Sequence, residues 1–90
     1  MTTVQDTVIA SIKKFTYLSL PITRKTNLYE DLAFDSLTFI QLLLEIEQTF
    51  DITVSISEMQ PCLNVGNLIT LVEAKRKEKE DHAETIIKTP

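Results

Sequence analysis

The sequence predicts an all-α fold: an irregular antiparallel bundle of three main helices and one short helix, with a long first loop. Three observations lead to this prediction. The 90-residue chain has one glycine, three prolines and 43% hydrophobic residues, which is typical of compact, mainly helical chains rather than disordered ones. Its apolar residues repeat at helical spacing in three stretches. Residues that favour helix starts precede each of these stretches.

The first helix is expected within residues 1–17. Thr2 or Thr3 can cap its start, with Gln5 or Asp6 three residues further on as the partner in a capping box. One apolar stripe at helical spacing is expected to face the core. Its members are Val4, Val8, Ile12 and Phe15.

Residues 18–34 are expected to form a long connection. Pro21 blocks continuation of the helix, and the segment is rich in turn-forming residues. A loop this long is uncommon in a small domain unless it is pinned or functional. Burial over the bundle can pin it through its apolar side chains, which are Leu20, Ile22, Leu28, Leu32 and Phe34.

The second helix is expected at residues 35–50, and the chain is organised around its start. Asp35 is a favoured N-cap, which places Ser36 at the first helical position beside the positive end of the helix dipole. Such a place suits a phosphate, because unpaired N–H donors point outward there. The two residues therefore favour a phosphodiester on Ser36, and the alternative is that they only cap the helix.

The side chains of the second helix sort into three faces at ~100° per residue. The core face holds Phe39, Leu42, Leu43, Ile46 and Phe50. The opposite face, which we expect to be solvent-exposed, holds Gln41, Glu45 and Gln48. The flank between them, which also carries Ser36, holds Leu37, Ile40 and Leu44. Apolar residues on a partly exposed flank indicate a contact surface. For Ile40, an equally good interpretation is that it widens the core stripe.

The connector after the second helix contains a short helix. Ser55 or Ser57 can cap it, and Pro61 limits its length. Met59 and Leu63 are expected to cover the bundle.

The last helix is expected to begin after Asn64, a good capping residue. Its apolar stripe consists of Val65, Leu68, Ile69 and Val72. We expect a single domain over residues 1–78, followed by a charged, frayed tail over residues 79–90.

The charges are unevenly distributed. The chain has a net charge of −4, and between Thr26 and Ala74 it has acidic residues but no Lys or Arg. This argues against a nucleic-acid partner, which needs basic contacts, and favours partners with basic docking surfaces. The alternative is that these acids only keep a solvated face soluble.

Several classes of site are disfavoured by composition. The single cysteine, Cys62, excludes an internal disulfide and is expected to be a small buried hydrophobe. With one histidine and one cysteine, the sequence shows no triad and no set of metal ligands, so we expect no catalytic residue and no metal site. No apolar run reaches the length of a membrane span and no signal peptide is visible, so we expect no membrane insertion and a cytoplasmic location.

From Asp31 to Asp51 the chain reads DLAFDSLTFIQLLLEIEQTFD. This stretch resembles the acyl carrier protein family, whose signature is Asp-Ser-Leu at the start of the second helix, followed by an amphipathic helix that ends in Glu-x-x-Phe-Asp. The matching residues are Asp35, Ser36, Leu37, Glu47, Phe50 and Asp51. The resemblance extends through the last helix, near Val72, and implies a four-helix bundle of the acyl-carrier type.

In that family the serine carries 4′-phosphopantetheine from coenzyme A. The resemblance thus implies attachment at Ser36, with Asp35 in contact with the phosphopantetheinyl transferase and its metal. It implies a monomeric carrier, not an enzyme, that holds acyl intermediates as thioesters. Its partners would be acyl-activating, ketosynthase or acyltransferase-type enzymes of a fatty acid, polyketide or related specialised pathway.

The resemblance also implies two sets of contact residues. The partner-docking set is Leu37, Ile40, Leu44, Glu45 and Glu47. The set that lines an acyl pocket between the second helix and the short one is Leu42, Ile46, Met59, Leu63 and Leu68.

Two departures from the family pattern matter. Ala33 stands where the family usually has glycine, so a positive φ there would strain the backbone mildly. Fatty-acid carriers tend to have acids where Thr38, Gln41 and Gln48 stand. Docking should then depend more on apolar contact and less on salt-sensitive pairing, which suggests a dedicated partner set outside primary fatty-acid synthesis.

Two other functions stay open. The stretch LLLEIEQTFDITV resembles carriers of aminoacyl or peptidyl groups, including D-alanyl carriers, as well as fatty-acid ones. An unmodified helical interaction module, in which Ser36 only starts a helix, is the alternative of another class. The Met1 start favours a protein that stands alone.

Overall fold

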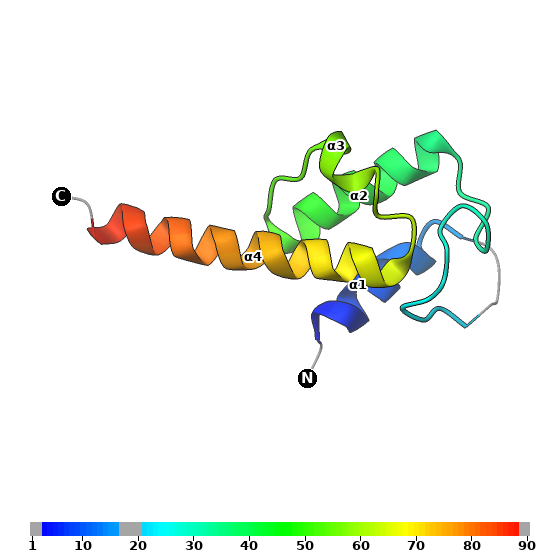
Figure 1. Cartoon of the computed structure of the whole chain (residues 1–90), viewed down its shortest axis with the longest axis horizontal. Coiled ribbons are helices and arrows are strands. Elements are labelled where there is room, and N and C mark those ends of the chain that lie inside the picture. Colours follow the sequence, from blue (N-terminus) through cyan, green and yellow to red (C-terminus); the bar gives the residue numbers. More distant parts are fainter. Residues whose placement is uncertain (1–2, 17–20, 89–90) are drawn as a thin grey trace.

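The computed structural model describes residues 3–16 and 21–88, with side chains described as far as residue 79. Four helices follow one another along the chain, α1 (Val4–Lys13), α2 (Ser36–Phe50), α3 (Ile56–Met59) and α4 (Val65–Lys88) (Figure 1). Within these ranges no strand occurs, and a single isolated bridge pairs Asn27 with Asn64. The prediction of an all-α fold with three main helices and one short helix is confirmed.

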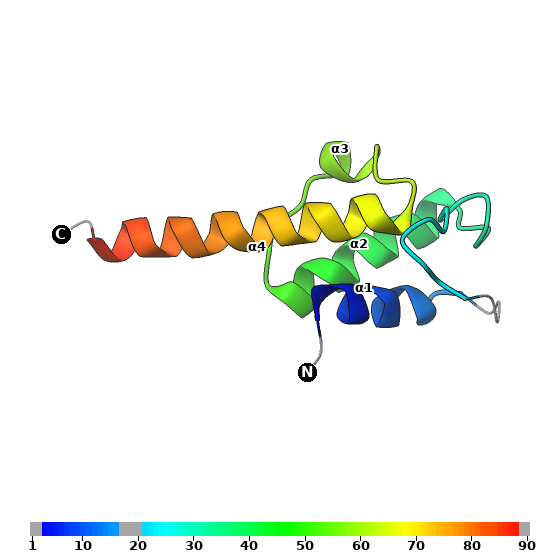
Figure 2. The same ribbon diagram turned by 60° about the horizontal axis from the view of Figure 1, so that its bottom comes forward.

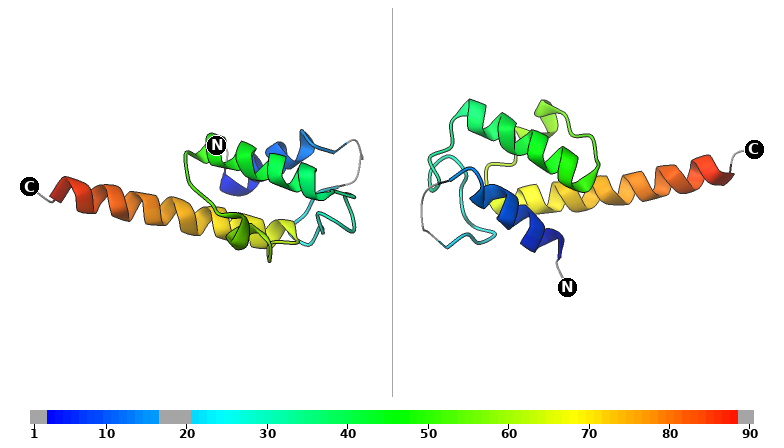
Figure 3. Two further views of the ribbon diagram at one scale, coloured as in Figure 1. Left: turned by 90° about the horizontal axis from the view of Figure 1, so that it is seen from above. Right: turned by 180° about the vertical axis from the view of Figure 1, so that it is seen from behind.

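α1 packs against both α2 and α4, and α3 packs against α2. α1 runs in the opposite direction to α2 and α4 (Figure 2). α3 and its two connectors carry the chain from the end of α2 back to the start of α4 (Figure 3). Beyond the bundle α4 continues as a single rod to its C-terminal end, far from the start of α2 (Figure 1). The frayed tail over residues 79–90 and the domain boundary before it stay predictions.

Local capping chemistry sets the helix starts. Thr3 and Asp6 form the expected capping box, in which the Thr3 Oγ1 accepts from the Asp6 N–H at 3.1 Å. Ser55 and Glu58 form a second box at α3. At α4 the Asn64 Oδ1 accepts from the Asn67 N–H at 2.8 Å, which confirms Asn64 as the cap.

The first helix is shorter than its apolar stripe predicted. α1 ends at Lys13, and the next turn tightens because the Phe15 N–H donates to the Ile12 carbonyl at 3.0 Å. Phe15 follows the helix and is half-buried against the core. Tyr17, the expected last residue of the helix, lies outside the described residues.

The long first loop is pinned against the start of α4. Leu28, Leu32 and Phe34 are buried as expected, Ile22 is half-buried, and Leu20 lies outside the described residues. Backbone hydrogen bonds join the loop to the connector before α4, from the Leu28 N–H to the Leu63 carbonyl at 2.8 Å, and to α4 itself, from the Gly66 N–H to the Arg24 carbonyl at 2.8 Å. At Gly66 a Cβ would lie 2.9 Å from the Arg24 carbonyl oxygen, so this close approach requires glycine.

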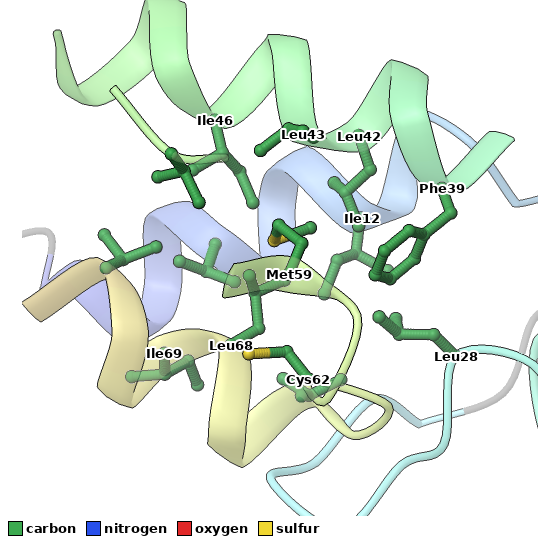
Figure 4. Packing of buried hydrophobic residues seen from close by; sticks show 14 of the residues in the cluster. Ile12, Leu28, Phe39, Leu42, Leu43, Ile46, Met59, Cys62, Leu68 and Ile69 are labelled. Carbon is green, nitrogen blue, oxygen red and sulfur yellow. The ribbon is translucent and has the colours of Figure 1, made fainter. Parts of the chain in front are cut away.

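The core is mainly aliphatic, with Phe34 and Phe39 also buried, and Met59 of α3 lies near its centre (Figure 4). Met59 is fully buried, as are Ile12, Leu42, Ile46 and Leu68 from the three main helices. α3 therefore contributes one anchoring side chain, Met59, to the interior of the bundle, and side chains of the three main helices surround Met59.

Candidate functional site

Ser36 is the first residue of α2, and its side chain is exposed. Asp35 caps the helix, with its Oδ1 accepting from the Thr38 N–H at 2.8 Å. This hydrogen bond, together with one from the Thr38 side chain, lowers the pKa of the Asp35 carboxyl from its ordinary value. A carboxylate that is ionised at neutral pH thus lies directly beside an exposed hydroxyl.

The start of α2 offers free hydrogen-bond donors next to that hydroxyl. Among the described residues, the backbone N–H groups of Ser36 and Leu37 have no partner. The helix dipole adds a partial positive charge at the same end. The start of α2 also lies at the opposite end of the molecule from the tip of α4 (Figure 1), so the long helix does not cover it. This arrangement suits a phosphate ester on the hydroxyl.

Ala33, three residues before Ser36, has a left-handed backbone with φ of 56°. Its neighbours Leu32 and Phe34 are both buried, and the Phe34 N–H donates to the Leu28 carbonyl at 3.1 Å. These contacts fix the turn, so Ala33 adopts a conformation that favours glycine. The mild strain expected at this position is therefore present.

The apolar flank of α2 lies at the surface. Leu37 is 65% exposed, Ile40 37% and Leu44 51%. The core face expected for this helix is buried at four of its five positions, namely Phe39, Leu42, Leu43 and Ile46, and Phe50 is half-buried. Ile40, the least exposed of the three, lies at the border between the core face and the surface.

The two acids of α2 are engaged within the chain. The Glu45 Oε2 lies 2.6 Å from the Lys14 Nζ, and only 22% of the Glu45 side chain is exposed. Glu45 is thus less exposed than we expected for a residue on the solvent-facing side of α2. The reason is that Lys14, just beyond the end of α1, contacts it. The Glu47 Oε2 accepts from the Val54 N–H at 2.9 Å and so holds the start of the next connector.

Four of the five residues expected to line an acyl pocket meet in the core, and one does not. Leu42, Ile46, Met59 and Leu68 are fully buried, and Figure 4 shows their side chains near one another. Leu63 is 45% exposed, so the expectation that it covers the bundle is wrong. The connector after α3 turns its neighbour Cys62 inward instead, where the Sγ lies 3.5 Å from the Glu58 carbonyl oxygen.

An open hollow of about 550 Å³ lies at the other end of α2, beside α4. It is lined by Asp51, Ile52, Thr53, Lys75, Glu78 and Lys79. This hollow could not be predicted from the sequence, because no periodic pattern relates these two distant segments. Its charged residues include the ion pair between Asp51 and Lys79, whose atoms are 2.5 Å apart.

The remaining chemistry of the described residues is sparse. Burial raises the pKa of the Cys62 thiol, which makes it a poor nucleophile at neutral pH. Within the part of the chain that the structure describes, no three His, Cys, Asp or Glu side chains group closely enough to hold a metal ion. No described helix is both long enough and apolar enough to cross a membrane.

Comparison with known proteins agrees with this geometry. Residues 6–72 match the family model described as a phosphopantetheine attachment site. An acyl carrier protein of Amoebophilus asiaticus is 31% identical over 75 residues, which cover 83% of this chain and 94% of that protein. An acyl carrier protein of Phytoplasma australiense is 34% identical over 55 residues, which cover 61% of this chain and 72% of that protein.

A solved structure shares the fold. It is described as an acyl carrier protein from Mycobacterium tuberculosis, with a TM-score of 0.75, 33% sequence identity, and coverage of 80% of this chain and 97% of that one. The match with the family model, over residues 6–72, includes the whole of α2 and its capping residue Asp35. The chain belongs to the acyl carrier protein family, whose members carry 4′-phosphopantetheine.

Proposed function

We propose that Ser36 is the residue that bears 4′-phosphopantetheine, and that the chain delivers acyl groups held on this arm to partner enzymes. The observation that supports the proposal best is the exposed Ser36 hydroxyl at the first position of α2, beside free N–H groups. When attached, the arm supplies a thiol on which acyl groups are carried as thioesters. The residues around Ser36 present it to solvent.

Asp35 has the second role in this proposal. Its carboxylate is exposed, ionised at neutral pH and adjacent to Ser36 in sequence. It can therefore contact the phosphopantetheinyl transferase and the metal ion that this enzyme uses. Its Oδ1 accepts from the Thr38 N–H, and because a carboxylate has about four lone-pair sites, it can still accept that further contact.

The partner enzymes we propose are of the acyl-activating, ketosynthase or acyltransferase type, and Leu37, Ile40 and Leu44 are the docking residues. For the acyl group we propose the interior beside Met59, between Leu42, Ile46 and Leu68. These side chains already fill that space, so an acyl chain enters only when α3 shifts. α3 has four residues, which makes it the element that moves at the lowest cost.

The test is the intact mass of the apo protein after incubation with coenzyme A and a broad-specificity phosphopantetheinyl transferase. We expect a gain equal to one phosphopantetheinyl group. Ser36→Ala removes the hydroxyl and should abolish the gain. Ser57→Ala, at an exposed serine of α3, is the matched control and should leave it unchanged. A wild-type protein that gains no mass, or a gain that persists in Ser36→Ala, would reject the proposal.

A further inference from the structure

Tyr29 of the first loop is held close to the start of α2. Its ring packs on the ring of Phe39, with the centroids 5.3 Å apart. Phe39 follows Ser36 by three residues, so the two side chains are neighbours along the helix. The Phe34 N–H, two residues before the serine, donates at 3.1 Å to the Leu28 carbonyl, which is bonded to the Tyr29 nitrogen. Tyr29 is thus fixed against residues that precede and follow Ser36.

The backbone around Tyr29 is fixed by an asparagine. The Asn27 Oδ1 accepts from the Tyr29 N–H at 2.9 Å and from the Glu30 N–H at 2.8 Å. The Asn27 N–H in turn donates to the Asp31 Oδ2 at 2.7 Å. Side-chain bonds of this kind stabilise a turn locally. The place of the tyrosine is therefore set before any arm is attached, which lowers the entropic cost of a contact with it.

The Tyr29 hydroxyl is open to a further partner. The ring of Tyr29 is half-buried against the core. Among the described residues the hydroxyl has no hydrogen-bond partner, and no buried side-chain nitrogen or oxygen of these residues is left without one. The hydroxyl therefore reaches solvent while the ring is held by the protein. Tyrosine combines an apolar body with a polar end in this way where a surface meets a ligand.

The donors that this part of the chain offers to an anionic group on Ser36 are uncharged. Exposed acids lie close to it in sequence at Glu30, Asp31 and Asp35, and the segment between them contains no Lys or Arg. A phosphodiester on the serine can be bound here by N–H groups at the start of α2 and by hydroxyls. The Tyr29 hydroxyl is such a donor, and its ring adds an apolar surface beside it.

We propose that Tyr29 is a contact residue for the 4′-phosphopantetheine arm on Ser36. Its hydroxyl donates a hydrogen bond to an oxygen of the arm, and its ring packs against the two methyl groups of the pantoyl unit. The proposal depends on the proposed function, because it requires the arm on Ser36. The contact restrains the first part of the arm beside the first loop and leaves the thiol end free.

The test is NMR of the protein after the arm has been attached with coenzyme A and a phosphopantetheinyl transferase. We expect nuclear Overhauser effects (NOEs) between the ring protons of Tyr29 and the pantoyl methyl protons. The chain has two tyrosines, so Tyr17→Phe leaves Tyr29 as the remaining one and assigns the signals. The absence of these NOEs in a protein that carries the arm would overturn the inference.

Tyr29→Phe isolates the hydroxyl. The variant keeps a ring that can pack on Phe39 and loses one hydrogen bond to the arm, so we expect the ring-to-methyl NOEs to weaken about threefold or more. Tyr17→Phe is the matched control, the same change at the other tyrosine, and should leave the NOEs unchanged. NOEs that persist at full strength in Tyr29→Phe, or that weaken equally in Tyr17→Phe, would overturn the inference.

A second measurement separates contact with the arm from a structural role. The arm is absent before modification, so Tyr29→Phe should leave kcat/KM for attachment within about twofold of the wild-type value. A larger fall would mean that the tyrosine acts on the fold or on the transferase, and would overturn the inference. If the wild-type protein gains no arm, the proposed function fails together with this inference. An arm on Ser36 without NOEs to Tyr29 removes this inference alone.

Discussion

Glu58 of α3 joins two interactions through one carboxylate: its Oε1 accepts from the Ser55 N–H at 3.0 Å, and its Oε2 is paired with Lys75 of α4. The first interaction completes the capping box of α3. The second ties the shortest helix to the longest one. In the proposed function an acyl chain enters the core when α3 shifts, so this carboxylate would restrain that movement.

Removing Lys75 should loosen α3 selectively. In Lys75→Met the α3 helix keeps its capping box but loses its tie to α4, so we expect the amides of Met59 and Gln60 to exchange with solvent about threefold faster. Hydrogen exchange followed by NMR measures this. Lys77→Met is the control, because Lys77 is exposed and forms no ion pair among the described residues. Unchanged exchange in Lys75→Met would show that the pair does not restrain α3.

Replacing Ala33 should stabilise the protein. Ala33→Gly relieves a positive φ of 56°, and we expect the free energy of unfolding to rise by about 0.5–1 kcal/mol. Urea unfolding gives the value. Ala10→Gly, at an exposed position inside α1, is the control and should lower the free energy of unfolding by about 1 kcal/mol. A loss of stability in both variants would contradict the strain assigned to Ala33.

Met59 should be the anchor of α3. Met59→Ala leaves a cavity in the core, so we expect the free energy of unfolding to fall by about 2–4 kcal/mol. Met59→Leu keeps most of the volume and should cost less than about 1.5 kcal/mol. Urea unfolding again measures both. A loss below about 0.5 kcal/mol in Met59→Ala would mean that α3 is not packed on the core in solution.

Acid should destabilise the fold. The pKa values of Asp35, Glu45, Asp51 and Glu58 are all lowered, by the Thr38 hydrogen bond for Asp35 and by hydrogen bonds from lysines for the other three. A carboxyl whose pKa is lowered by folding stabilises the folded state at pH values above its ordinary pKa. This stability is lost as the pH falls through the lowered pKa of the folded state. We expect a urea midpoint that is steady from about pH 7 to 5 and falls below about pH 4.

Asp51→Asn separates one contribution to that pH dependence. Asp51 has φ of 53°, a conformation that asparagine also tolerates, so the variant changes the charge with little change in backbone strain. Its urea midpoint should fall less steeply below about pH 4 than that of the wild type. If the urea midpoints of the variant and the wild type fall equally steeply below about pH 4, the pair with Lys79 adds nothing to stability.

The start of α2 could be predicted from the sequence because capping is local. Asp35, Ser36 and Thr38 are close neighbours, and the hydrogen bond from the Thr38 N–H to Asp35 depends on that spacing alone. The same holds for the Thr3 and Ser55 capping boxes. The buried face of α2 followed from helical periodicity for the same reason.

What the sequence could not show depends on segments that are distant in the chain. Lys14 and Glu45 are 31 residues apart, and no periodicity relates them, so helical spacing alone predicts a solvent-facing Glu45. The position of Leu63 cannot be predicted, because its connector has no regular pattern that says which side chains face inward. The ion pairs of the acidic segment around α2 have the same origin, since the partners of its acids are Lys14, Lys75 and Lys79, which lie outside it.

Tandem mass spectrometry of peptides from the modified protein locates the phosphopantetheinyl group and tests the role of Ser36 most directly. The proposed function requires that the group lies entirely on Ser36, in the peptide that begins α2. A group found on any other serine or threonine, or a Ser36 peptide that stays unmodified, would contradict it.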